Sequence, residues 1–84
     1  MIVKSATGPV DLSNPENIRR GMAFRSPHGE AVVVTEPLFP GEKWNIWRTS
    51  RDGSINLGDE MYPYTFLGCD PAIAAREDVE RYGV

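Results

Sequence analysis

The sequence predicts an all-β domain with minor α content: a small five-stranded antiparallel barrel followed by a C-terminal helix. Three observations support this fold class. Asp52-Gly53 lies between two alternating segments, turn residues recur roughly every seven to twelve positions, and a capped amphipathic segment ends the chain. With 84 residues, the chain is long enough for one domain with one small core.

The clearest β-hairpin is the segment 43–57, KWNIWRTSRDGSINL. Asp-Gly favours a two-residue type I′ turn, because both central positions of that turn need positive φ. Such a turn places Trp47 opposite Gly58, and residues opposite each other point to the same side of the sheet. The face expected to enter the core then carries Trp44, Ile46, Ile55 and Leu57. The other face is polar except for Trp47.

Short elements precede this hairpin. A short edge strand is expected at 2–4, ending before Gly8-Pro9. Asn14 as N-cap, with Pro15 at the first helical position, predicts one helical turn that directs Leu12 and Ile18 inward.

A strand at 22–25 follows, with Met22 and Phe24 on its inner side. Ser26–Gly29 forms a turn, because proline presets φ and glycine permits the last position. The β-branched segment 30–36 is expected to be a well-buried strand, and it leads into a proline-bounded loop at 37–42.

The final third begins with an acidic connecting turn at 58–63, followed by a last strand at 64–68. Asp70, Pro71 and Gly83 bracket a helix predicted over 71–82. Its inner face is expected to hold Ala72, Ala75, Val79 and Tyr82. The expected core of the barrel contains Met22, Phe24, Val32 or Val33, Trp44, Ile46, Ile55, Leu57 and Phe66.

This order of elements resembles the SH3-like barrels over roughly residues 18–69. In those barrels a tight distal hairpin is followed by a single helical turn and a closing strand. The resemblance concerns the pattern of elements alone, because the acidic aromatic motif of signalling SH3 domains and a glycine-centred KOW motif are both absent. It implies a small antiparallel barrel and no particular activity.

Composition argues against several classes of function. Cys69 is the only cysteine and His28 the only histidine, so neither a disulfide nor a four-ligand zinc site of the Cys/His type can form within the chain. Neither a catalytic set nor a cofactor-binding loop is recognisable, and Cys69 with His28 is the one candidate nucleophile–base pair. We therefore expect a protein that is not an enzyme and binds no metal or cofactor.

The apolar start of the chain is too short for a signal peptide or a membrane span, so the expected location is cytoplasmic.

Exposed aromatic residues are the strongest functional indication. Tryptophan and tyrosine are enriched among interface hot spots, because they bury much area with few rotatable bonds. The residues expected to bind a protein partner are Phe39, Trp47, Tyr62 and Tyr64. For Trp47 the alternative is structural: the ring could cover Gly58 or lie beneath the C-terminal helix.

The charge distribution supports a second hypothesis, a nucleic-acid-binding barrel. Residues 19–51 carry a charge of +3 and residues 52–84 carry −5, within a net charge of −3. The basic residues that would contact phosphates are Arg19, Arg20, Arg25, Arg48 and Arg51. The overall acidic charge argues against this alternative.

The function predicted from the sequence is therefore a small stand-alone protein–protein interaction module that acts as an adaptor, regulator or inhibitor. Small free-standing domains among phage and mobile-element accessory proteins offer a fold-level analogy. Homodimerisation through an edge strand or the C-terminal helix is a further alternative.

Overall fold

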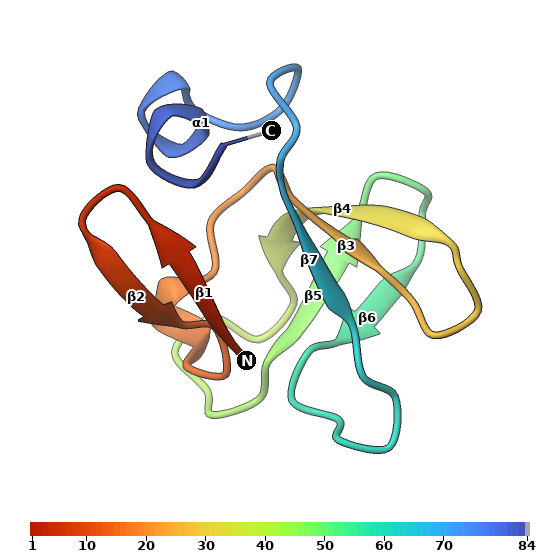
Figure 1. The fold of residues 1–84 in the computed structure, drawn as a ribbon. Helices are drawn as coiled ribbons and strands as arrows, with labels where there is room; N and C mark the ends of the chain where they lie inside the picture. Colours follow the sequence, from red (N-terminus) through yellow and green to blue (C-terminus); the bar gives the residue numbers. More distant parts are fainter. Residues whose placement is uncertain (84) are drawn as a thin grey trace.

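A computed structural model describes residues 1–83, and within them the chain is mostly β, with seven strands in two antiparallel sheets (Figure 1). A two-stranded sheet contains β1 (Ile2–Ser5) and β2 (Gly8–Asp11). A five-stranded sheet contains β3 (Met22–Arg25), β4 (Ala31–Pro37), β5 (Ile46–Thr49), β6 (Ser54–Asn56) and β7 (Thr65–Cys69). The 3₁₀ turn η1 (Pro15–Asn17) and the helix α1 (Arg76–Tyr82) complete the described chain.

The larger sheet has the strand order β6-β5-β4-β3-β7. Four consecutive strands form a meander, and the last strand returns to pair with the first strand of that meander. Within residues 1–83 the outer strands β6 and β7 are not paired with each other, so the sheet is not closed into a barrel. The mostly β class with a C-terminal helix is thus confirmed, while the SH3-like barrel stays a prediction.

Strand β3 lies at the centre of the core. Its inward residues Met22 and Phe24 are fully buried, as the alternation of the segment predicts. Phe24 is opposite Phe66 of β7, and the two ring centroids lie 5.6 Å apart. The register between β3 and β7 shifts between Ala23 and Phe24, an irregularity of the β-bulge kind.

The β5–β6 hairpin has a different register from the predicted one. Trp47 lies opposite Ile55 instead of Gly58, and the Thr49 amide donates to the Gly53 carbonyl oxygen at 2.9 Å. The loop therefore has three residues, with Asp52 at its last position in a left-handed conformation, φ 58°. Three-residue hairpin loops commonly end with such a residue, and aspartate tolerates it.

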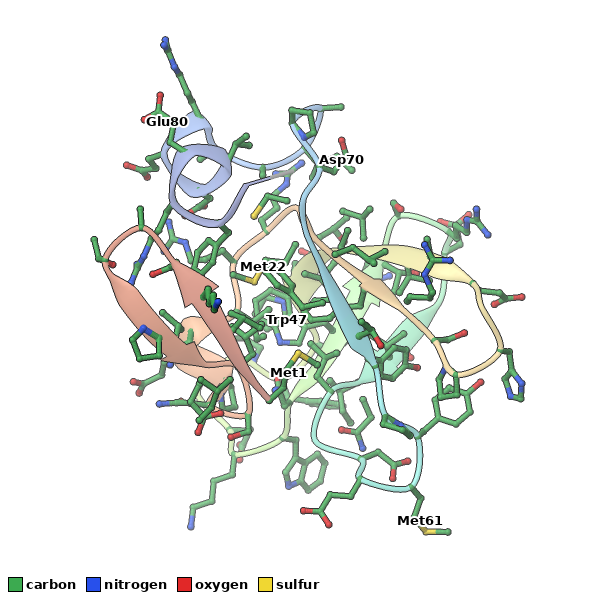
Figure 2. All side chains as sticks on the ribbon, in the orientation of Figure 1. Met1, Met22, Trp47, Met61, Asp70 and Glu80 are labelled. Carbon is green, nitrogen blue, oxygen red and sulfur yellow. The ribbon has the colours of Figure 1, made fainter. Side chains whose placement is uncertain are left out.

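The observed register differs from the predicted one by three positions. Because three is an odd number, the face of β5 that packs with Ile55 is the opposite of the predicted face. Trp47 is 6% exposed and belongs to the core, whereas Trp44 is 62% exposed. The expectation that Trp44 faces the core and Trp47 faces solvent is therefore wrong. Figure 2 shows Trp47 in the interior, near Met22.

A buried hydrogen bond accompanies this arrangement. The Trp47 indole N–H donates to Asn45 Oδ1 at 2.8 Å, and Asn45 is itself buried. A buried tryptophan needs a partner for its N–H, and Asn45, two residues earlier in the chain, provides it. The buried apolar residues are Leu12, Ile18, Met22, Phe24, Val34, Trp47, Ile55 and Cys69. Of the remaining expected core residues, Val32, Leu57 and Phe66 are half-buried against this cluster, and Ile46 is half-buried on the other face of β5.

The N-terminal segment forms a hairpin rather than a single edge strand. Strand β2 was not expected, because Gly8-Pro9 indicated an end to the strand; instead Gly8, with φ 117°, opens the return strand. The hairpin packs on the core through Val3 and Val10. The helical turn that follows is confirmed, since the Asn14 side chain accepts a hydrogen bond from the Glu16 amide.

The C-terminal helix is shorter than predicted. Pro71–Ile73 belong to a separate turn, in which the Ala74 amide donates to the Asp70 carbonyl oxygen, and Ala75 is extended. Of the expected inner face, Val79 and Tyr82 pack on the core, while Ala72 and Ala75 are exposed. None of the helices in the described chain has the length and apolar character needed to cross a bilayer.

Candidate partner-binding surface

The exposed aromatic pair of this molecule consists of Phe39 and Trp44. Phe39 is 41% exposed, and its ring centroid lies 5.4 Å from that of Trp44 in a T-shaped arrangement. Phe39 therefore has the exposed position that its loop predicts, but its aromatic neighbour on the surface is Trp44. The sequence reasoning missed Trp44 because the assumed two-residue turn assigned it to the core.

The loop between β4 and β5 holds this pair in place. The Leu38 amide donates to the Ile46 carbonyl oxygen at 3.0 Å, which ties the loop to β5 at its base. The Glu42 amide donates to the Phe39 carbonyl oxygen at 3.1 Å and closes a tight turn around Pro40. These bonds and the fixed φ of proline limit the backbone freedom of the loop, so less entropy is lost when a partner docks.

A groove of about 270 Å³ runs between this loop and the 3₁₀ turn η1. The loop supplies two exposed rings, η1 supplies the opposite wall, and the buried Trp47 contributes to the lining beneath them. The residues lining the groove are Pro15, Glu16, Pro37, Phe39, Pro40, Gly41, Glu42, Trp44 and Trp47. Trp47 thus contributes to the groove lining as a buried ring, which corresponds to the structural alternative given for it, although it lies opposite Ile55 and not Gly58.

Two further grooves continue from the aromatic pair. Trp44 also lines a groove of about 370 Å³ together with Ser13 and Gly58. Ser13 and Gly58 in turn line a third groove of about 220 Å³, which reaches Tyr64. The shared residues connect the three grooves, and the β4–β5 and β6–β7 loops that contribute to their lining lie at the end of the molecule opposite α1 in Figure 1.

Tyr62 and Tyr64 form a second aromatic cluster in this region. Their ring centroids are 5.5 Å apart, and the His28 ring lies 5.4 Å from that of Tyr62. Both tyrosines are half-buried. Burial chiefly, with Tyr62 and Asp59 nearby, raises the pKa of Tyr64 above its usual value. Beside this cluster, Met61 is 93% exposed and points away from the protein in Figure 2.

The five arginines of the nucleic-acid hypothesis lie on several elements. Arg19 makes an ion pair of 3.3 Å with Asp78, and Arg48 makes one of 2.9 Å with Glu36. Two of the five cations are thus partly neutralised by carboxylates. The others are exposed and lie before β3, at its end and in the β5–β6 loop: Arg20, Arg25 and Arg51.

Cys69 and His28 occupy different surroundings. Cys69 is buried at the end of β7, where burial and the nearby Asp78 raise the pKa of its thiol to about 11. A thiol with so high a pKa carries little of the nucleophilic thiolate near neutral pH. His28 is exposed in the β3–β4 turn and contacts Tyr62. Within residues 1–83, no three His, Cys, Asp or Glu side chains are grouped so that they could hold a metal ion.

In comparisons with protein-family models, with curated proteins and with solved structures, no match to this chain was found.

Proposed function

We propose that this chain is a small protein–protein interaction module without enzymatic activity, which binds its partner through the surface around Phe39 and Trp44. The observation that carries the proposal is the exposed T-shaped pair in a groove bordered by three prolines. Exposed aromatic rings on a restrained loop are typical of interaction sites, because a folded chain gains nothing from leaving them in water. Tyr64 lines the third groove of this surface, and Tyr62 contacts Tyr64.

The proposed architecture beneath this surface is an SH3-like barrel. Its support is the sheet order, in which a four-strand meander is followed by a strand that pairs with the first one. The module would act as an adaptor, regulator or inhibitor, and the analogy to phage and mobile-element accessory proteins remains one of fold alone. We place it in the cytoplasm, because its single cysteine fits a reducing compartment.

Binding to nucleic acid is the less favoured alternative. Its support is the cluster of positive charge in the middle of the sequence, but Arg19 and Arg48 already pair with carboxylates. Titration with single- and double-stranded oligonucleotides at low salt distinguishes the two functions. Tight, steeply salt-dependent binding that Arg48→Glu abolishes would favour the nucleic-acid hypothesis.

The experiment that tests the module is partner capture with matched variants. Immobilised protein is exposed to lysate of the source organism, and the capture of one reproducible partner is compared for wild type, Trp44→Ser and Met61→Ser. Trp44→Ser should lose about 2 kcal/mol or more of binding free energy, as at a hot spot. Met61→Ser is the control, because it removes an even more exposed apolar side chain from outside the Phe39–Trp44 groove.

Two results would contradict the proposal. One is a Trp44→Ser protein that captures the partner as well as the wild type does. The other is a loss of capture in Met61→Ser alone, which would move the binding surface to the loop before β7. Light scattering on the wild-type protein measures its oligomeric state. If the protein is a homodimer, the partner is a second copy of the chain.

A further inference from the structure

The charged side chains that line the Phe39–Trp44 groove are both carboxylates. Glu16 comes from η1 and Glu42 from the β4–β5 loop, and both are exposed. Among the ion pairs of residues 1–83, neither glutamate has a cationic partner within 4.0 Å. Two formal negative charges without a paired cation therefore line this groove, while the exposed Lys43 lines the neighbouring one.

The aromatic walls favour the same kind of ligand. The ring faces of tryptophan and phenylalanine carry partial negative charge, and tryptophan attracts cations most strongly. Phe39 and Trp44 meet at an interplanar angle of 74°, so they form two walls of a corner. A long basic side chain can lay its methylene groups along such walls while its charged end reaches a carboxylate.

We propose that this groove binds a lysine or arginine side chain of the protein partner; this inference rests on the proposed function and names the chemistry of that partner. The main support for this proposal is charge complementarity, because the groove combines two acidic side chains with two exposed aromatic rings. The net charge of −3 adds a weak long-range attraction for a basic segment. The two further grooves continue from Trp44 and provide room for residues on that side of the bound cation.

The test uses capped pentapeptides of identical sequence in which the central residue, flanked by prolines, is arginine, lysine, glutamine or glutamate. Binding is followed by NMR through the indole N–H signals of the two tryptophans. These signals should differ in chemical shift, because the Trp47 N–H is hydrogen-bonded to Asn45 and buried while Trp44 is exposed. The arginine and lysine peptides should shift the Trp44 signal in a saturable manner and bind about tenfold more tightly than the glutamine peptide.

Two variants test the carboxylates. Glu16→Gln and Glu42→Gln should each weaken binding of the arginine peptide by about two- to fivefold, since each removes one exposed charge pair. The glutamine peptide should be unaffected by either change. Glu30→Gln is the matched control, because Glu30 is an exposed carboxylate in the β3–β4 turn and does not line the groove.

Several results would overturn the inference. These are equal affinity for the arginine and glutamine peptides, absence of a saturable shift at Trp44, and equal weakening by Glu30→Gln. None of them affects the proposed function, which fails only if Trp44→Ser retains the captured partner. A module that captures its partner through Trp44 yet binds both peptides equally would recognise apolar shape instead of charge.

Discussion

The contrast between the two tryptophans gives the sharpest test of the fold. The whole domain is expected to be stable by about 4–12 kcal/mol, from roughly 0.05–0.15 kcal/mol per residue. Truncating the buried Trp47 to alanine should cost about 3–5 kcal/mol, enough to unfold a marginal domain. The more informative change is Trp47→Phe, which keeps an aromatic ring and removes the indole N–H.

The expected loss of folding stability in Trp47→Phe is estimated from the loss of one hydrogen bond. Without the indole donor, the buried Asn45 Oδ1 loses its 2.8 Å partner. An unsatisfied buried acceptor costs about 1–3 kcal/mol. For a domain of this size, that corresponds to a fall in Tm of about 4–24 °C. Trp44→Ala should cost about 1 kcal/mol or less, because the ring is mainly in contact with solvent and with Phe39.

Urea unfolding followed by far-UV circular dichroism measures both variants without relying on tryptophan fluorescence. The midpoint should fall clearly for Trp47→Phe and little for Trp44→Ala, with similar m values. A larger loss for Trp44→Ala than for Trp47→Phe would refute the reasoning. It would mean that the hairpin has the two-residue turn after all and that Trp44 belongs to the core.

Three further predictions concern other parts of the fold. Gly21→Ala should destabilise the protein by several kcal/mol or prevent folding, because φ is 93° and the new methyl group would collide with the turn before α1; thermal melting measures this. The raised pKa of Cys69 predicts that stability falls as pH rises from about 9 to about 11, since the unfolded thiol ionises first and the folded one stays neutral; Cys69→Ala should lack this fall in pH-dependent urea midpoints. Arg19→Gln should cost about 1–2 kcal/mol in urea unfolding, because it leaves the buried Asp78 carboxylate without its cation, whereas Arg20→Gln, at an exposed neighbour, should change stability by about 0.5 kcal/mol or less.

The sequence alone predicted the structure of segments whose conformation depends mainly on their own residues, such as caps, turns and short alternating strands. The turn η1 follows from Asn14 as cap and Pro15 behind it, and the turn after β3 follows from Pro27 and Gly29. The alternation of Met22 and Phe24 likewise predicted their burial, because a short strand with apolar residues on one side has only one face to bury. For the candidate site, sequence alone predicted Phe39 on an exposed, proline-bounded loop.

Tertiary packing decided the rest of the site. Asp52-Gly53 is compatible with both a two-residue and a three-residue loop, and the two differ by an odd number of positions in register. The choice depends on which face of β5 packs on the core; in the structure that face carries Trp47, opposite Ile55, and Asn45 two residues earlier accepts the buried indole N–H. The same choice leaves Trp44 beside Phe39 at the surface, so the composition of the exposed aromatic pair depends on the packing of β5 on the core, which no local pattern in the sequence indicates.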